Sequence, residues 1–437
     1  MKVYLISLGC AKNKVDSEVI IGNMIVNDNI ELTLDMSKAD LIIINTCAFI
    51  ESAKTEAINT IFEVLDNKKK KQKVLVCGCL STRYANEIAS LIPEVDRFVT
   101  IKEYPNLKEI VNSLFNDHPF TNEVSSFNRI ITGMKESVYV KISEGCNNRC
   151  SYCAIPLIRG PFVSRKMEDI IFEVTNLVAN DAYEINLISQ DTTNYGIDLY
   201  NDYKIVSLLE ELEKIEGNFK IRLLYLYPSL VSDELINYIA NSSKVLPYFD
   251  IPLQHSQTNI LKSMNRRGDK EFIIALINKI RHKIPNAILR TTMIVGFPGE
   301  TDNDFNGLLE FVKEMEFDRL GAFPYSAEED TVGASMPNQV AEEIKERRLE
   351  ALYLVQDDIA LKANERHIGS ITDVLIVDYD QDSYAYIGRN YAFAPDDIDG
   401  FIFVYSQQEL EIGDVVKVKI LDASINTLSG EVVSDEA

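Results

Sequence analysis

The chain alternates extended apolar runs with amphipathic helical patterns, and this alternation limits its possible folds more than any other feature. In the first quarter, a helix-like stretch follows each of four apolar runs, at residues 2–8, 39–45, 73–76 and 97–100. Strands that alternate with helices are joined by crossovers and form a parallel sheet. Residues 1–115 are therefore predicted to form a doubly wound parallel α/β domain.

A second series of strand–helix units follows a polar linker. Its six candidate strands lie at residues 138–143, 184–189, 220–227, 248–253, 288–295 and 319–323. Six such units predict a partial (β/α)6 barrel over residues 132–365, which includes a long charged helix near its end. Short Val-, Ile- and Tyr-rich stretches separated by glycines fill residues 366–437. This last pattern predicts a small antiparallel β-barrel.

The composition excludes several classes of protein. Of 437 residues, 46% are hydrophobic and 25% are charged, as in packed globular domains. No window approaches the ~18 consecutive apolar residues of a membrane-spanning helix, so we expect a cytoplasmic protein with no membrane partner. The formal net charge of −23 repels nucleic-acid phosphates. A basic protein is therefore the expected partner, and tRNA is not.

Three cysteines lie close together just after the first barrel strand, at the end where such barrels place their chemistry. They are Cys146, Cys150 and Cys153. Seven cysteines in all, unevenly spaced, form no disulfide pattern, and the cytoplasm keeps thiols reduced. Structural zinc and ferredoxin-type clusters need a fourth ligand, and none is nearby. Three thiolates on a cluster would leave one iron open, while a zinc site and unrelated buried thiols remain the alternatives.

The sequence around this triplet resembles a family signature. Glu-Gly precedes it at residues 144–145, and Ala-Ile-Pro-x-x-Arg-Gly follows it at residues 154–160. These stretches are similar to the signature of the radical S-adenosylmethionine (SAM) methylthiotransferases. The resemblance implies a [4Fe-4S] cluster whose open iron binds the amino and carboxylate groups of SAM. Reduction would then release a 5′-deoxyadenosyl radical, so that the cofactor carries the difficult step.

A second triplet is dispersed over the N-terminal domain. Cys10, Cys47 and Cys79 each follow a predicted strand, and the carboxyl ends of parallel strands share one edge of a sheet. Any one of these thiols alone could be a packing residue. Together with their flanking residues they resemble the family's N-terminal domain, which implies a second, auxiliary [4Fe-4S] cluster that supplies or holds the transferred sulfur. Cys77 is an alternative to Cys79 as its third ligand.

Weaker signals come from polar residues near the ends of the later barrel strands. Such positions often contact ligands, and we expect SAM contacts from Gln190, Asp191, Arg222, His255 and Gly296. For His255 a hydrogen-bonded core histidine is an equally good interpretation, because radical abstraction needs no acid–base histidine. The glycine-rich turn at residues 295–299 resembles a SAM-contacting loop of the family.

The substrate is predicted from charge and from the resemblance. One branch of the family modifies a tRNA adenosine, and another modifies an aspartate of a small-subunit ribosomal protein. Residues 365–437, similar to a TRAM domain, hold about fifteen acidic residues and four basic ones. This charge disfavours RNA and attracts a basic ribosomal protein, with Asp396, Asp397 and Asp399 as expected docking charges. The stretches at residues 188–196, 225–228 and 250–255 also resemble the protein-modifying branch.

The resemblance thus implies β-methylthiolation of an aspartate, with one SAM methylating the sulfur and a second providing the radical. It also implies a flavodoxin- or ferredoxin-type electron donor. A tRNA methylthiotransferase is the alternative within the family. An iron–sulfur or zinc protein without catalytic activity is the alternative outside it.

Overall fold

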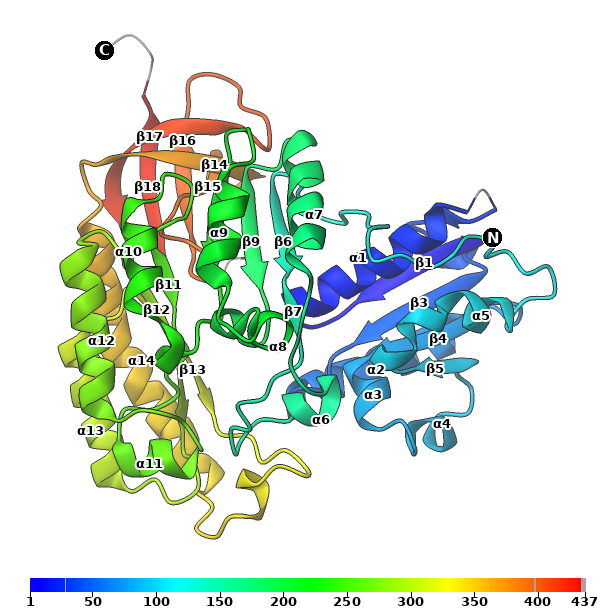
Figure 1. The fold of residues 1–437 in the computed structure, drawn as a ribbon, viewed down its shortest axis with the longest axis horizontal. Helices are drawn as coiled ribbons and strands as arrows, with labels where there is room; N and C mark the ends of the chain where they lie inside the picture. The colour runs from blue at the N-terminus through cyan, green and yellow to red at the C-terminus, as the bar shows by residue number, and fades with distance from the viewer. Residues whose placement is uncertain (28, 397, 434–437) are drawn as a thin grey trace.

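The computed structural model describes residues 1–27, 29–396 and 398–433, and the chain forms three parts in sequence order (Figure 1). The N-terminal part, drawn in blue, lies beside a larger α/β barrel, and the C-terminal strands, drawn in orange and red, lie at one end of that barrel. Within the described ranges, no helix is both long enough and apolar enough to cross a membrane.

Five parallel strands form the N-terminal sheet in the order β2-β1-β3-β4-β5. They are β1 (Lys2–Ser7), β2 (Glu31–Leu32), β3 (Leu41–Thr46), β4 (Lys73–Gly78) and β5 (Arg97–Val99). The sequence predicts the other four strands, but β2 escapes prediction because its two residues are exposed and too few to show a period.

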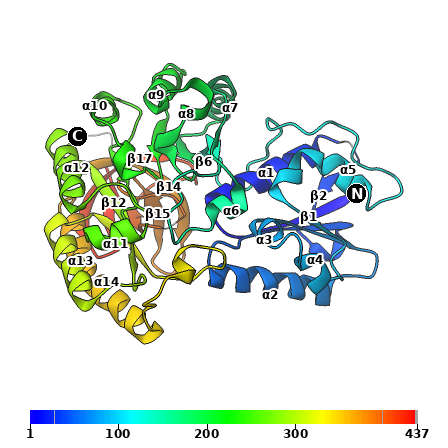
Figure 2. The ribbon, with the colours of Figure 1, turned by 60° about the horizontal axis from the view of Figure 1, so that its bottom comes forward.

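Helices cover both faces of this sheet, so the domain is doubly wound as predicted. Apolar side chains of α1 (Ala11–Ile25) and α5 (Leu107–Asn112) pack on one face. Those of α2 (Glu51–Asn67), α3 (Cys79–Arg83) and α4 (Ile88–Leu91) pack on the other. Figure 2 shows α1 and α2 on opposite sides of the strands.

Six parallel strands form the partial barrel as two three-stranded sheets, ordered β10-β9-β6 and β11-β12-β13. Their bounds are β6 (Ser137–Lys141), β9 (Glu184–Ile188), β10 (Lys220–Leu223), β11 (Tyr248–Asp250), β12 (Ile288–Val295) and β13 (Arg319–Pro324). The sheets meet after β10, where the Leu226 amide donates to the Asp250 carbonyl at 2.8 Å. In the described chain β6 and β13 do not pair, which leaves the barrel open on that side.

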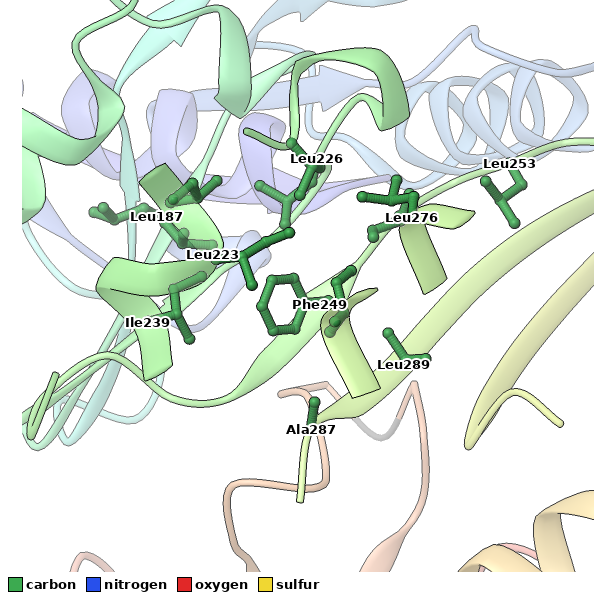
Figure 3. Close-up of a cluster of buried hydrophobic side chains, with 14 of the residues drawn as sticks. Leu187, Leu223, Leu226, Ile239, Phe249, Leu253, Leu276, Ala287 and Leu289 are labelled. Atoms are coloured by element: carbon green, nitrogen blue, oxygen red, sulfur yellow. The ribbon is translucent and has the colours of Figure 1, made fainter. Parts of the chain in front are cut away.

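Long helices pack on the outside of the barrel around the largest apolar core of the molecule. They are α7 (Met167–Ala179), α9 (Ile205–Glu213), α10 (Asp233–Asn241), α12 (Lys270–Lys283), α13 (Asp302–Met315) and α14 (Glu342–Glu365). Figure 3 shows part of this core, where Leu223, Phe249 and Leu289 of three neighbouring strands lie near Ile239 of α10 and Leu276 of α12. Shorter elements are β7 (Ser143–Glu144), α6 (Ile155–Arg159), β8 (Val163–Ser164), α8 (Ile197–Tyr200) and α11 (Thr258–Ser263).

The last strands close into a small barrel in the order β14-β15-β16-β18-β17. They are β14 (Ile371–Asp380), β15 (Ala385–Arg389), β16 (Phe401–Tyr405), β17 (Val415–Ala423) and β18 (Thr427–Val432). Neighbouring strands pair antiparallel as predicted, apart from β16 and β18, which pair in parallel.

Between β15 and β16, residues 390–396 and 398–400 pack against inward-facing side chains of the large barrel. This packing changes the roles that Arg222 and Asp399 can have. The Arg222 guanidinium donates to the Tyr391 carbonyl at 2.9 Å. The Asp399 carboxylate accepts from Tyr248 and pairs with Arg290 at 3.1 Å. Asp399 is therefore a buried structural residue and cannot be the exposed docking charge expected from the sequence. Asp397 lies outside the described residues.

Salt bridges also join the N-terminal domain to the loop after β13. Arg83 and Lys54 both contact the Glu328 carboxylate, at 2.7 and 3.2 Å. Next to them, the Tyr84 hydroxyl donates to Glu329 at 2.8 Å. Because Arg83, Lys54 and Glu328 are all largely buried, loss of any one of them would leave an uncompensated buried charge at this boundary.

Candidate functional site

Both cysteine triplets line one cavity of about 320 Å³ between the N-terminal domain and the barrel. One wall comes from the carboxyl edge of the N-terminal sheet and the other from the loop after β7. Strand ends of parallel sheets are the usual ligand-binding edge, and here two such edges face each other. The six thiols in the cavity wall are Cys10, Cys47, Cys79, Cys146, Cys150 and Cys153.

The N-terminal triplet reaches the cavity because each cysteine lies just after the carboxyl end of a strand of the N-terminal sheet. Cys10 caps the start of α1, Cys47 directly follows β3, and Cys79 opens α3. Gly78, the last residue of β4, has a φ of 93°, and a Cβ there would lie 2.2 Å from the Asn45 side-chain oxygen. Only glycine allows this turn, which carries Cys79 out of the strand to the sheet edge.

Cys77 lies elsewhere. Its side chain is on β4 and packs in the apolar layer under α1 and α5, whereas Cys79 packs on the side of α2 and α3. Burial raises the pKa of the Cys77 thiol to about 12. Cys77 is not part of the cavity wall.

The barrel triplet lies on a tight loop that is fixed by backbone contacts. The Cys146 amide donates to the Gly160 carbonyl at 3.2 Å, and the Cys153 amide donates to the Cys150 carbonyl at 3.0 Å. Gly145 has a φ of 74°, and a Cβ there would lie 2.1 Å from the Pro161 carbonyl oxygen. The backbone therefore positions all three thiols on one short loop.

The thiols of the cavity are in an environment that disfavours free thiolates. Burial raises the pKa to about 12 for Cys79 and Cys153 and to about 11 for Cys146. Bound metal cations would reverse this balance, because they bind and stabilise thiolate. Within the described ranges, no three His, Cys, Asp or Glu side chains converge on a single-ion site. In a [4Fe-4S] cluster held by three cysteines each thiolate binds its own iron, so the thiols need not converge on one ion.

Arg159 of α6 connects the two triplets. Its guanidinium binds the Asp16 carboxylate at 2.9 Å and the Glu144 carboxylate at 3.0 Å. It also donates to the Asn13 side-chain oxygen and lies 3.6 Å from the Cys79 sulfur. Although burial opposes ionisation, Lys141 and Arg159 lower the pKa of Glu144 to about 2. The N-terminal domain and the cysteine loop are thus joined by a buried ionic network.

Lys12 and Tyr225 form a second contact across the cavity. The Lys12 ammonium lies 3.0 Å from the centre of the Tyr225 ring, and both residues line the cavity wall. Burial lowers the pKa of Lys12 to about 8. Tyr225 has a φ of 65° and Gln254, in the same wall, has a φ of 76°. Such backbone strain in non-glycine residues occurs preferentially at functional sites.

Arg266 approaches the barrel triplet from the loop after α11. Its guanidinium lies 3.8 Å from the Cys150 sulfur and 4.4 Å from the centre of the Tyr227 ring. No sequence motif indicates Arg266, and Lys12 stands inside a family-like stretch that assigns it no role. Their importance follows from tertiary structure alone.

The predicted SAM contacts are only partly brought together. Gln190 lines the cavity and donates to Glu144 at 2.9 Å. Asp191 is buried behind it and accepts from the Asn148 amide at 2.7 Å. Both residues therefore lie beside the barrel triplet.

Arg222, His255 and Gly296 do not line the cavity. Arg222 is fully buried against Glu184, at 2.8 Å, and the C-terminal segment. His255 is fully buried, burial lowers its pKa to about 3, and its Nδ1 accepts from the Gln257 amide at 3.0 Å. The Gly296 amide donates to Glu300 at 2.7 Å, and a Cβ at Gly296 would lie 2.3 Å from Lys345. The tight space at Gly296 is thus filled by the protein itself.

Comparisons with known proteins agree with this three-part architecture. Residues 2–100 match the uncharacterized protein family UPF0004, residues 140–312 match the radical SAM superfamily, and residues 368–433 match the TRAM domain. The solved structure of the radical SAM methyltransferase TsrM from Kitasatospora setae, with cobalamin and a [4Fe-4S] cluster bound, aligns with a TM-score of 0.57 at 13% identity and covers 74% of each chain. That likeness concerns the fold alone.

Relatives that match over the full length are more specific. A protein from Clostridium botulinum is 46% identical over 446 residues, covering 100% of this chain and 99% of its own. One from Clostridioides difficile is 44% identical over 446 residues and covers 100% of both chains. One from Aquifex aeolicus is 46% identical over 431 residues, with 98% and 97% covered. Each is named ribosomal protein uS12 methylthiotransferase RimO, and the chain belongs to this family of radical SAM methylthiotransferases.

Proposed function

We propose that this protein transfers a methylthio group to the β-carbon of an aspartate in ribosomal protein uS12. The observation that carries the proposal is the single cavity walled by both cysteine triplets, in a chain whose relatives are named uS12 methylthiotransferases. A radical is required because a C–H bond at this carbon is not acidic enough for a side-chain base at neutral pH. A ribosomal substrate also implies the cytoplasm as the place of reaction.

In this proposal each triplet holds one [4Fe-4S] cluster, Cys10, Cys47 and Cys79 on one side and Cys146, Cys150 and Cys153 on the other. Support comes from the arrangement of three thiols in each wall of the cavity. Burial raises the pKa of these thiols, and bound iron would stabilise them as thiolates. When bound, the clusters would supply the electron for reductive cleavage of SAM and the site from which sulfur is transferred.

The chain's own residues orient the reactants and exclude water. Apolar side chains of Ile155, Ile158 and Pro252 line the cavity and lower its polarity, which protects a reactive radical. Gln190 is the proposed SAM contact, held in place by its hydrogen bond to Glu144. Arg266, beside Cys150, would offset negative charge on the cluster of the barrel triplet.

The proposed partners follow from charge. A net charge of −23 favours the approach of a lysine- and arginine-rich ribosomal protein and opposes that of an RNA backbone. This supports uS12 over the tRNA alternative. A flavodoxin- or ferredoxin-type protein would supply the electrons.

The decisive experiment incubates anaerobically reconstituted enzyme with purified uS12, SAM and a reductant, and examines uS12 by mass spectrometry. We expect one methylthio group on one aspartate, and about eight irons per chain if two four-iron clusters form. The variant with Cys146, Cys150 and Cys153 all changed to Ala should retain about half of the iron but form no deoxyadenosine. An iron content near four in the wild type, or deoxyadenosine formation by the triple variant, would contradict the proposal.

A further inference from the structure

The Lys12 ammonium has no anionic partner in the described chain. Lys12 is only 7% exposed, and among the residues that the structure describes its nitrogen has no salt bridge and no hydrogen bond to an acceptor. The Cys10 thiol and the Asp250 and Glu144 carboxylates lie near enough to act on its charge, and the face of the Tyr225 ring lies 3.0 Å from its nitrogen. A buried cation without an anion is costly, so a ligand anion in the cavity would gain a strong interaction.

The carboxylates around Lys12 are already engaged by other cations. Asp250 pairs with Arg290 at 2.9 Å. Glu144 pairs with Lys141 at 2.7 Å and with Arg159 at 3.0 Å. Neither can turn to Lys12 without breaking an existing buried pair. The open position beside the ammonium is therefore left for a ligand in the cavity that Lys12 helps to line.

Tyr225 is held in a strained conformation that places its ring against this ammonium. Its φ of 65° is rare for an aromatic residue, and its amide donates to the buried Asp250 carboxylate at 2.9 Å, which stabilises that conformation. The ring attracts the cation and closes one side of it. An anion must therefore approach Lys12 from the cavity.

We propose that Lys12 binds the side-chain carboxylate of the substrate aspartate and so selects a carboxylate substrate. This inference rests on the proposed function. Lys12 lies in the first turn of α1, two residues after Cys10, so a carboxylate bound there is held beside the N-terminal triplet. In aspartate the β-carbon is bonded directly to that carboxylate carbon, and Lys12 would place the reacting carbon next to the sulfur source. An adenosine base offers no such group.

The test pairs variants of the enzyme with variants of the substrate. Lys12→Met removes the charge but retains an unbranched side chain, and Lys12→Arg retains the charge. Lys14→Met removes the charge of a partly exposed lysine on the same helix, which lies near Asp396. Purified uS12 and its Asp→Asn variant at the modified position are the two ligands. Their dissociation constants are measured with reconstituted, SAM-free enzyme, so that binding is observed without turnover.

We expect the wild type to bind the aspartate form roughly tenfold to a hundredfold more tightly than the asparagine form, as a charge-assisted hydrogen bond provides. Lys12→Met should lose this preference by weakening only the aspartate form. Lys12→Arg should retain most of it, and Lys14→Met should not change it. The iron content and the KM for SAM in Lys12→Met should equal those of the wild type.

Two results would overturn the inference. If Lys12→Met weakens the binding of both forms of uS12 equally, Lys12 does not bind the aspartate carboxylate selectively. If the KM for SAM rises while uS12 binding is unchanged, the cation holds the SAM carboxylate instead. Failure of the proposed function would be recognised by a different result: the wild type would form no methylthio product on uS12. Failure of the Lys12 inference alone leaves that product intact and the preference for aspartate unchanged in Lys12→Met.

Discussion

At the scale of single residues, Cys77 and Cys79 provide the sharpest test of the site. We expect Cys79→Ala to lose the cluster of the N-terminal triplet, about half of the iron, and methylthio transfer, while SAM cleavage at the barrel triplet continues. Cys77→Ala should retain both activities and lose only roughly 1–2 kcal/mol of unfolding free energy, because it removes one buried sulfur from an apolar layer. Iron content, methylthio product on uS12, deoxyadenosine yield and thermal unfolding measure these four effects. The reverse pattern would assign the ligand to Cys77.

Sequence reasoning could place the six cavity cysteines because strand ends of parallel sheets meet at one edge. It could not separate Cys77 from Cys79, since alternate residues of a continuing strand face the same side. The φ of 93° at Gly78 breaks that alternation, and it is a property of the folded backbone. Lys12 and Arg266 were beyond prediction for a related reason. Their roles depend on the side chains that surround them in the folded protein, and the spacing of residues in the sequence does not reveal these neighbours.

At the scale of elements, Glu184 of β9 joins the large barrel to the C-terminal one. Its carboxylate binds Arg222 and Arg389, each at 2.8 Å, and accepts from Ser137 at 2.7 Å. We expect Glu184→Gln to lower the unfolding free energy by roughly 3–5 kcal/mol at pH 7, because two buried guanidinium groups lose their counter-charge. Calorimetric unfolding measures this, with the exposed Glu168→Gln on α7 as a near-neutral control.

The same carboxylate gives a pH dependence. Although burial opposes it, Arg389 and Arg222 hold the pKa of Glu184 far below its usual value of 4.5. A lowered folded-state pKa means that its stabilisation is present above about pH 4.5 and is lost as the pH falls below that value. The difference in unfolding free energy between wild type and Glu184→Gln should therefore shrink in acid. A constant difference down to pH 3 would show that the two arginines do not lower the pKa of Glu184 in the folded protein.

The segment at residues 390–396 and 398–400 explains why Arg222 does not line the cavity and why Asp399 is not exposed, contrary to the sequence predictions. Arg222 and Asp399 stand at a strand and in an acidic loop, patterns typical of ligand contacts and of exposed charge. Both are buried because this segment packs into the open barrel, and only tertiary structure shows this.

A matched pair of variants in this segment tests its packing. Asp399→Ala should cost roughly 3 kcal/mol in urea unfolding, since Tyr248 and Arg290 lose a buried partner. Asp396→Ala should cost roughly 1 kcal/mol, because its side chain is 50% exposed and mainly accepts from Tyr139. Equal small effects would contradict the buried role of Asp399.

At the scale of the whole molecule, charge should govern encounter with uS12. Neutralising the exposed Asp378, Asp382 and Glu411 of the C-terminal barrel should slow association and reduce its salt dependence, with little change in dissociation. The control removes three exposed charges from α2, those of Glu56, Glu63 and Asp66, in the N-terminal domain. Stopped-flow association rates at two salt concentrations separate the two sets. If both triple variants slow association equally, only net charge matters and the C-terminal barrel is not the docking face.

The ionic contacts between the N-terminal domain and the barrel should affect how much uS12 is modified for each SAM that is consumed. Each triplet lies within one part of the chain, so each proposed cluster has all its cysteine ligands in one part. The cavity is walled by both parts, which Arg159 and Arg83 join through carboxylates across the boundary. An enzyme whose two parts separate would still consume SAM, and the radical would be quenched without reaching a sulfur acceptor. The yield of modified uS12 per SAM consumed therefore reports how tightly this boundary stays closed during a turnover.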